Sequence, residues 1–281
     1  MDGLYLYCIR EKAEDPPTFR TRGIDGKREI FTIIHNELEA VVSRVSLLKF
    51  TSEEIRKKAQ EDLNWIRKKA IIHEDVIEEA MKGIDGLVNV IPMRFGIIFK
   101  DKTGLKETLD RDHAKMKRLL NKIRGKQEWS TKIYLMDSEK FELTVKEKNE
   151  EIRAKEEKMA SMPEGMAYFM EEELKETVSN EVNKELDSIL DILFGKLGEE
   201  AAGSVKTRIL DREMTGKAER MVFNAAFLVQ ADKVDSFKKT LENIDEELNI
   251  KGLHLEYSGP WPSYNFANFT NGGRPPGRHD E

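Results

Sequence analysis

The sequence has few of the features that would commit it to a disulfide-bonded, redox-active or membrane-embedded architecture. Cys8 is the only cysteine in 281 residues, which rules out an internal disulfide and a CxxC motif. It falls in the apolar run of residues 4–9, where we interpret it as a small buried residue. No apolar run approaches the length of about 20 residues that spans a bilayer, and the first residues show no basic stretch followed by an apolar one. We expect a cytoplasmic protein that does not enter a bilayer membrane.

Motifs for nucleotide, hydrolytic or metal chemistry are also missing. Neither GxGxxG nor GxxxxGK[ST] occurs, and GxSxG and HExxH are absent as well. The histidines show no ligand spacing; they are His35, His73, His113, His254 and His279. Carboxylates are abundant, but no pair of them is marked out for acid and base catalysis. We therefore predict no enzyme activity, no cofactor and no metal, and an enzyme with a dispersed site is the alternative.

The charge of the chain is unevenly distributed. Charged residues make up 36% of the sequence and hydrophobic residues 39%, with a net charge of -6, which is typical of a globular protein with a highly charged surface. Residues 1–125 hold 25 Lys and Arg against 21 Asp and Glu, a net of +4, whereas residues 126–281 hold 22 against 32, a net of -10. A net of +4 without a clustered basic face is weak evidence for nucleic-acid binding. We interpret the asymmetry as two differently charged, solvated surfaces.

The first 125 residues predict an α+β domain. Runs rich in β-branched or aromatic residues predict three strands at 4–9, 29–34 and 39–45. From the capping box at Thr51, apolar residues recur at helical spacing as far as Met81, so we expect one long amphipathic helix. His73 lies on its apolar stripe and is interpreted as a core histidine. A turn at 84–86, short strands at 87–91 and 95–99, and a second helix at 103–124 complete the domain.

Residues 126–258 predict a second domain. A hairpin is expected from strands at 129–136 and 140–145, then a solvated helix or linker at 146–158 and a long helix from Pro163 to Leu197. Strands at 204–209, 221–230 and 252–257, with a helix at 232–248, follow. The grouping of strands around helices favours a ferredoxin-like arrangement. Residues 259–281 form an aromatic tail, and Gly, Pro and charge from residue 271 onward predict a disordered end.

Two segments suggest a specific role. In residues 91–99, Arg94 stands between apolar strands and near Gly96, so we expect its guanidinium either to bind carboxylates or strand-end carbonyls, or to face a partner. In the second segment, residues 259–269, two prolines restrict a chain that carries large aromatic residues. Such a segment is either docked on its own protein or inserted into a partner.

These segments belong to a series of landmarks that resembles the GvpF/GvpL family of gas vesicle accessory proteins. The landmarks run in family order along nearly the whole chain: Tyr5-Leu6-Tyr7, His73 with Val76, Pro92-Met93-Arg94-Phe95-Gly96, Gly165-Met166-Ala167-Tyr168, Asn224-Ala225-Ala226-Phe227-Leu228-Val229, and Gly259-Pro260-Trp261-Pro262-Ser263-Tyr264-Asn265-Phe266. Cys8, Ile97 and Ser263 depart from the residues usual at those positions, which could alter local packing or the stiffness of the tail.

The resemblance implies a two-domain protein, with an α+β N-terminal domain and a modified ferredoxin-like C-terminal domain that ends in an aromatic tail. It implies a non-enzymatic assembly factor or chaperone that binds the small hydrophobic gas vesicle shell protein, works with other accessory proteins and is itself a minor vesicle component in some cases. The residues expected to bind a partner or to mark the fold are His73, Arg94, Phe95, Tyr168, Trp261, Tyr264 and Phe266. The alternatives are a generic ferredoxin-like interaction module and an enzyme with a dispersed site.

Overall fold

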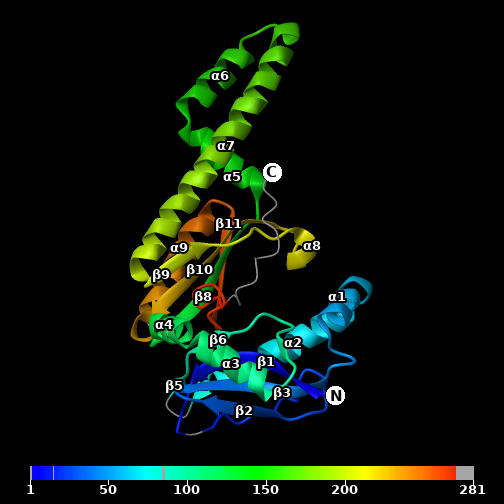
Figure 1. Cartoon of the computed structure of the whole chain (residues 1–281). Helices are drawn as coiled ribbons and strands as arrows, with labels where there is room; N and C mark the ends of the chain where they lie inside the picture. Colours follow the sequence, from blue (N-terminus) through cyan, green and yellow to red (C-terminus); the bar gives the residue numbers. More distant parts are fainter. Residues whose placement is uncertain (1, 15, 84–85, 270–281) are drawn as a thin grey trace. The chain divides into compact units, whose positions relative to one another are not determined.

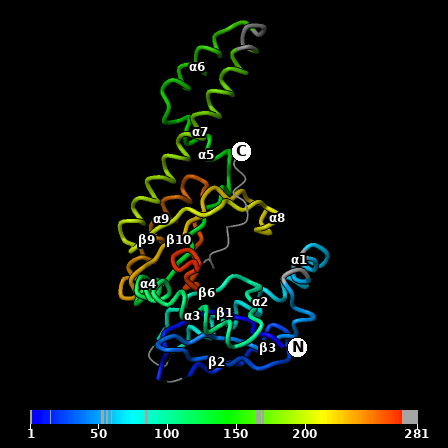
Figure 2. Tube along the Cα trace, viewed as in Figure 1, coloured from blue at the N-terminus to red at the C-terminus, as the bar shows by residue number. Residues whose placement is uncertain are grey.

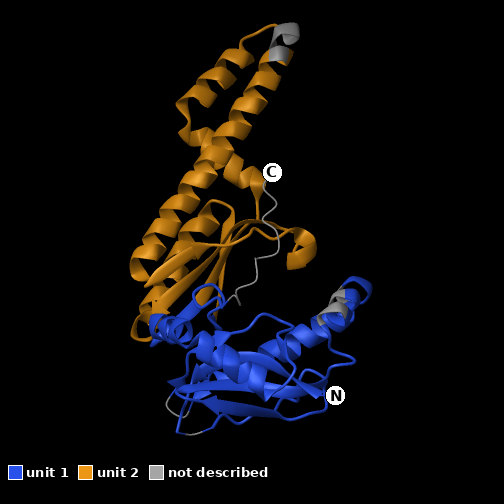
Figure 3. Cartoon of the chain, in the orientation of Figure 1, with its two compact units in different colours: residues 1–128, 260–281 blue, residues 129–259 orange. Residues whose placement is uncertain are grey.

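The computed structural model describes residues 2–14, 16–83 and 86–269 (Figure 1). The chain divides into two compact units, which Figure 3 distinguishes by colour. Unit 1 comprises residues 1–128 and 260–281, and unit 2 comprises residues 129–259. The predicted turn residues 84 and 85, and the predicted disordered end from residue 271, lie outside the described residues. No helix within the described ranges is both long and apolar enough to cross a membrane.

An antiparallel sheet with strands of unequal length forms the centre of unit 1. Its strands are β1 (Asp2–Glu11), β2 (Ile30–His35), β3 (Leu38–Ser46), β6 (Val90–Pro92) and β7 (Ile98–Phe99), in the order β2-β3-β1-β6, with β7 also paired to β1. All residues of β1 from Gly3 to Arg10 are buried. Because side chains alternate between the faces of a strand, β1 must be covered on both sides, which agrees with its continuous apolar run.

Helices cover the sheet of unit 1. They are α1 (Ser52–Glu61), α2 (Leu63–Ala80), α3 (Lys102–Arg111) and α4 (His113–Ile123). The buried residues of α2 share one core with Tyr5, Tyr7, Val41 and Val45. Helices α3 and α4 form a second pair, in which α3 contacts β7 and α4 contacts β6. These two helices bury Leu105, Leu109, Met116 and Leu120.

Two helices that the sequence predicted as continuous are each interrupted by an aspartate. Thr51 caps α1 by accepting a hydrogen bond from the Glu54 N–H, as predicted, but the helix ends at Glu61. The Asp62 carboxylate then accepts from the Trp65 N–H and begins α2. The predicted helix 103–124 also divides, at Asp112, into α3 and α4, but there the aspartate side chain makes no capping hydrogen bond to α4. At Asp62 the short polar side chain competes for a backbone N–H group, so it can start a new helix inside an unbroken apolar period.

The predicted strands 87–91 and 95–99 are shorter than expected. The structure has a two-residue pair, β4 (Lys82–Gly83) with β5 (Gly86–Leu87), and then β6 and β7. Phe95 and Gly96 lie in the loop between β6 and β7, and Gly96 has a φ of 90°. That backbone conformation is accessible to glycine but strained for residues with a Cβ, and it is incompatible with a continuous strand.

Unit 2 contains a four-stranded sheet. Its strands are β8 (Lys126–Leu135), β9 (Gly203–Lys206), β10 (Arg220–Gln230) and β11 (Leu253–Trp261), in the order β11-β8-β10-β9. Two long helices, α7 (Glu164–Glu200) and α9 (Val234–Ile250), share its core through residues such as Leu190, Leu193, Phe237 and Leu241. The turn of helix α8 (Arg212–Thr215) and the 3-10 turn η1 (Ala231–Lys233) lie in the connections before β10 and α9.

The predicted hairpin at residues 129–145 is wrong. Its first strand is part of β8, but its second is the helix α5 (Ser138–Lys148). Asp137, which lies between the two predicted strands, accepts a hydrogen bond from the Lys140 N–H and caps the helix. Phe141 and Val145 are both buried, and their spacing of four residues places them on one helical face.

Helices α6 and α7 pack against each other, and Figure 2 shows their Cα traces side by side. The predicted solvated segment contains α6 (Glu150–Ala160), which packs on α7 through Ile152, Leu174 and Val178. α7 begins after Pro163, as predicted. Leu186 and Leu193 of α7 lie in the core of unit 2, while Val182 and Ile189 pack against it.

A buried ion pair fixes one end of β1 to its neighbours. Arg10 and Glu39, on the paired strands β1 and β3, are 2% exposed, and the Arg10 Nε lies 2.6 Å from the Glu39 Oε2. Arg10 Nη1 also donates to the carbonyl oxygen of Ala80 at the end of α2, at 3.1 Å. The guanidinium therefore joins two strands and a helix.

We expect Glu39→Ala to lower the free energy of unfolding by about 3 to 5 kcal/mol, because it removes a buried carboxylate that is paired with the Arg10 guanidinium. Denaturation by guanidinium chloride, followed by circular dichroism, measures the loss. Glu29→Ala is the matched control, since the Arg22–Glu29 pair is 58% and 85% exposed and should contribute less than about 1 kcal/mol. Equal losses in the two variants would contradict the structural role of the buried pair.

Candidate functional site

The aromatic tail lies on unit 1. We call residues 262–269 the docked segment. Ala267 N–H donates to the Ser263 carbonyl oxygen at 2.8 Å, which closes a tight turn. Pro262, Ser263, Phe266, Ala267 and Phe269 are buried. Of the two alternatives, docking on its own protein is therefore what the structure shows for these residues.

The first anchor of the docked segment is Tyr264. Its hydroxyl donates to the Glu74 Oε2 on α2 at 2.8 Å, and its ring packs against the core that contains Tyr5 and Cys8. Burial raises the pKa of Glu74 above its usual range, and the negative charges of Glu78 and Asp75 add to that effect. Burial and the neighbouring Glu74 carboxylate likewise raise the pKa of Tyr264.

The second anchor is Asn265, on a carboxylate from the beginning of β8. Asn265 Nδ2 donates to the Glu128 Oε1 at 2.7 Å, and its backbone N–H donates to the Oε2 at 3.2 Å. Glu128 is 3% exposed. Burial raises its pKa to about 7, against the opposing effect of the N–H groups of Asn265 and Phe266.

The third anchor is a pair of phenylalanines against α4. Phe266 and Phe269 are 7% and 6% exposed. Lys122 Nζ lies 5.7 Å from the centre of the Phe266 ring and donates to the Phe266 carbonyl oxygen at 3.1 Å. Lys115 Nζ lies 4.7 Å from the centre of the Phe269 ring. The docked segment thus joins α2, the beginning of β8 and α4.

Next to Tyr264, a buried hydrogen-bond network holds the loop between β6 and β7. Gly96 N–H donates to the Tyr5 hydroxyl at 3.0 Å, and that hydroxyl lies 3.0 Å from the His73 Nδ1. The other ring nitrogen, Nε2, lies 2.9 Å from the Met93 carbonyl oxygen. A carbonyl can only accept, so Nε2 carries the proton and Nδ1 accepts from Tyr5. Burial lowers the pKa of His73 to about 4, which keeps the ring neutral at physiological pH.

The backbone holds the same loop at both ends. Met93 N–H donates to the Tyr7 carbonyl oxygen at 2.8 Å, and Leu6 N–H donates to the Ile97 carbonyl oxygen at 2.9 Å. The loop therefore bulges between two pairings on one edge of β1. Phe95 is half-buried, with its ring centre 6.1 Å from that of Tyr5 and 5.8 Å from that of His73, in edge-on contacts.

Arg94 does not have the structural role that the sequence first suggested. Its side chain is exposed, and the structure records no hydrogen bond or ion pair between it and another described residue. The expected guanidinium fork on carboxylates or carbonyls is therefore wrong. The loop that carries Arg94 is nevertheless fixed on both sides, so the guanidinium projects from a rigid base.

The structure brings some of the predicted residues together and separates others. His73, Phe95, Tyr264 and Phe266 all lie in unit 1, near the docked segment. Tyr168 is on α7 in unit 2 and is 64% exposed, whereas Trp261 lies in unit 1, at the end of β11 and directly before the docked segment, and is 37% exposed. Sequence reasoning missed Glu74 and Glu128. The one available signal for Glu128 was an acidic residue just before the apolar strand residues 129–136.

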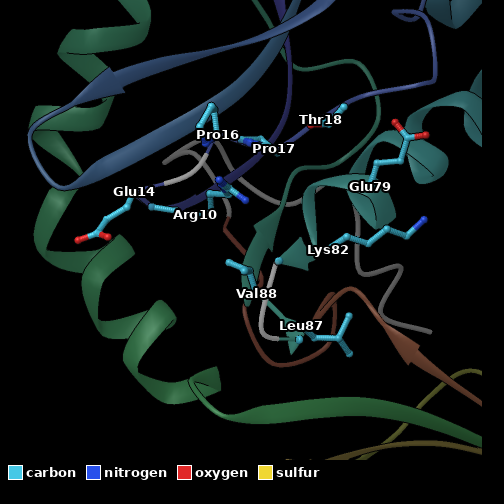
Figure 4. A pocket seen from close by; sticks show the side chains of 12 residues that line it. Arg10, Glu14, Pro16, Pro17, Thr18, Glu79, Lys82, Leu87 and Val88 are labelled. Atoms are coloured by element: carbon cyan, nitrogen blue, oxygen red, sulfur yellow. The ribbon is translucent and has the colours of Figure 1, made fainter.

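A pocket of about 560 Å³ lies elsewhere in unit 1 (Figure 4). It is lined by charged side chains and by the proline segment; among them are Arg10, Glu14, Pro16, Glu79 and Lys82. Two of its charged groups already have partners, because Arg10 binds Glu39 and the Glu79 carboxylate accepts from Thr21 N–H and its hydroxyl. These groups hold the fold together and do not converge on a vacant point.

The described residues show neither a metal-binding cluster nor an accessible thiol. No group of three or more His, Cys, Asp or Glu side chains among them is placed to hold a metal ion. Cys8 is buried, as predicted, and burial raises the pKa of its thiol. The arrangement around the docked segment is suited to holding a peptide segment by hydrogen bonds and aromatic packing.

Comparison with known proteins gives one consistent family. The family model described as "Gas vesicle synthesis protein GvpL/GvpF" matches residues 3–268. Gas vesicle protein F of Nostoc sp. (strain PCC 7120) is 26% identical over 271 residues, which cover 95% of this chain and 99% of the relative. Gas vesicle protein L of Streptomyces sp. (strain CB03234) is 24% identical over 263 residues, which cover 94% of this chain and 92% of the relative.

Solved structures show the same fold. The crystal structure of the gas vesicle protein GvpF from Anabaena sp. PCC7120 has a TM-score of 0.73 at 23% identity, over 96% of this chain and all of that one. The crystal structure of gas vesicle protein GvpF from Microcystis aeruginosa has a TM-score of 0.65 at 20% identity, over 95% of this chain and 99% of that one. The similarity extends through both units.

We expect Tyr5→Phe to lower the free energy of unfolding by about 1 to 3 kcal/mol, because the His73 Nδ1 and the Gly96 N–H both lose a buried partner. Hydrogen exchange at the Gly96 amide should accelerate in parallel. Tyr134→Phe serves as the control: its ring is also buried, but its hydroxyl has no recorded hydrogen bond to a described residue. Unchanged stability in Tyr5→Phe would contradict a stabilising role for these two hydrogen bonds.

The raised pKa of Glu128 predicts a pH dependence of defined sign. The folded protein holds this proton more tightly than the unfolded chain, so the Glu128 contribution to the free energy of unfolding falls as the pH rises from 4.5 to about 7. Relative to wild type, Glu128→Gln should therefore gain up to about 3 kcal/mol over that interval. The lowered pKa of His73 makes the free energy of unfolding rise with pH. This contribution is the same in wild type and variant, so it cancels when the two stability curves are subtracted. Parallel stability curves would refute the assignment.

Proposed function

Because this chain belongs to the gas vesicle synthesis protein GvpL/GvpF family, we propose that it is an accessory factor for the assembly of gas vesicles. The observation that carries the proposal is the match of the family model over residues 3–268, which covers nearly all of both units, including most of the docked segment. Relatives that match over at least 92% of their own length are named gas vesicle proteins F and L. The expected place of action is the cytoplasm, at the growing vesicle.

The finer part of the proposal is that the protein binds the small hydrophobic shell protein as a chaperone or nucleation factor. A subunit with a large apolar face aggregates unless that face is covered until it joins the wall. The proposal includes other gas vesicle accessory proteins as partners and retention of the protein as a minor vesicle component. No step in this role requires a cofactor, a metal, nucleic acid or a lipid bilayer.

Within this role we assign partner contact to the loop that carries Arg94. Three features support the assignment: the loop is held by buried hydrogen bonds, the guanidinium is exposed, and the half-buried Phe95 ring beside it offers apolar area. An arginine and an aromatic residue on a rigid base are the residue types that dominate protein interfaces. Tyr168 and Trp261 are exposed aromatic residues and remain candidates for additional contacts.

We also propose that unit 2 is a modified ferredoxin-like domain. The support is its order of elements, in which β8, α7, β9, β10, α9 and β11 follow one another along the chain. The spatial order β11-β8-β10-β9 places the first and third of these strands at the centre. Helices α5 and α6 are insertions in this scheme. The proposed division is into an N-terminal domain, this domain and the docked tail.

The direct test is co-expression with the small gas vesicle shell protein, followed by co-purification at low and at high salt. Capture that survives high salt supports binding through apolar surfaces, because salt screens charge pairs but not apolar contacts. Deletion of the gene in a vesicle-forming host is the complementary measurement. Vesicles of unchanged number and shape after deletion would end the proposal.

We expect Arg94→Ala to reduce capture of the shell protein while the free energy of unfolding changes by less than about 0.5 kcal/mol, because the side chain contacts solvent in the free protein. Arg94→Lys should restore capture only in part if a planar guanidinium is required. Arg118→Ala removes another exposed arginine, on α4, and serves as the control. Capture that is equal in all three variants and wild type would exclude Arg94 from the interface.

A further inference from the structure

Two carboxylates beneath the docked segment, Glu74 and Glu128, have neutral donors as their partners among the described residues. Glu74 accepts from the Tyr264 hydroxyl, and Glu128 accepts from the Asn265 amides. No Lys, Arg or His nitrogen of a described residue lies within 4.0 Å of either carboxylate. Glu128 is buried and Glu74 is half-buried, and burial raises the pKa of each. Charge in this place is costly unless a cation compensates it.

The neutral donors of Tyr264 and Asn265 bind these carboxylates more weakly than cationic donors would. A hydrogen bond from a cationic nitrogen to a carboxylate is roughly twice as strong as one between neutral groups. The two carboxylates meet consecutive residues of the docked segment, Tyr264 and Asn265. Two adjacent basic residues in the same turn would therefore place one cation on each carboxylate.

We call the surface of unit 1 that holds the docked segment its seat. At the positions of Phe266, Ala267 and Phe269, the seat favours apolar residues. Phe266 and Phe269 fill buried positions against α4, and Lys122 and Lys115 lie over their rings. These lysines would repel a basic residue at either position, whereas they attract an aromatic face. Position 267 is a fully buried alanine, which admits only a small side chain.

We propose that the seat of the docked segment is a binding site for a segment of another protein that carries two adjacent basic residues in place of Tyr264 and Asn265, followed by aromatic residues in place of Phe266 and Phe269. The docked segment is then a replaceable cover with the correct shape but without the complementary charge. The proposal rests on the assembly role and names the chemical class of a segment that the protein binds. Its test uses no shell protein. Its failure would therefore leave the assembly role untouched.

The probe is a fluorescent synthetic peptide with the sequence of residues 260–269 and the changes Tyr264→Arg and Asn265→Lys. The receptor is the full-length protein with Phe266→Ala and Phe269→Ala, which weaken its own cover. Fluorescence anisotropy should show that the basic peptide binds at least about tenfold more tightly than the unchanged peptide, and that added salt weakens the difference. Glu74→Gln or Glu128→Gln in this receptor should remove most of the gain, and Glu78→Gln, an exposed carboxylate on α2, should not.

A receptor that fails to fold is replaced by the wild-type chain. There the basic peptide, in excess, should accelerate hydrogen exchange in residues 262–269. A peptide of the same composition, with its two basic residues moved to positions 262 and 268, should not have this effect. Equal affinity of the basic and unchanged peptides, a gain that survives both glutamine substitutions, or unaltered exchange would each overturn the proposal.

Discussion

The burial of β1 on both faces is the constraint on which unit 1 depends. Every residue from Leu4 to Ile9 is at most 6% exposed, and the strand pairs with β3 along one edge and with β6 and β7 along the other. A strand in this position must carry apolar side chains in both directions, and any polar atom on it needs a partner inside the protein. Tyr5, Tyr7 and Arg10 satisfy that need with His73, Ser43 and Glu39. The same contacts connect the sheet to α2 and to the Arg94 loop.

Strands that are buried on both faces could be predicted because their apolar runs are continuous, and β1 and β10 are the clear cases. Helix breaks could not, because Asp62 and Asp112 interrupt the backbone without interrupting the apolar period. Asp137 shows the related ambiguity: an aspartate followed by polar residues suits both a turn and a helix cap. The spacing of Phe141 and Val145, four residues apart, was the evidence for a helix.

The candidate site was predictable through its aromatic residues and its histidine, which stand out in a chain rich in charge. Its carboxylates were not, since Glu74 and Glu128 resemble many other acidic residues until the fold brings them against the tail. Asn265 and Glu128 are 137 positions apart, a separation that no local pattern bridges. Arg94 stood out in the sequence, but its environment depended on the loop conformation at Gly96, which a residue pattern does not encode.

Cys8 has a practical consequence. The only thiol of the chain is fully buried in the centre of the sheet, and burial raises its pKa, so little thiolate is available to react at neutral pH. A cysteine introduced at an exposed position would therefore be the single reactive thiol of the folded protein. Spectroscopic probes or cross-linkers can then be attached at one chosen residue, such as position 94 or 168, without removing the natural cysteine from the core.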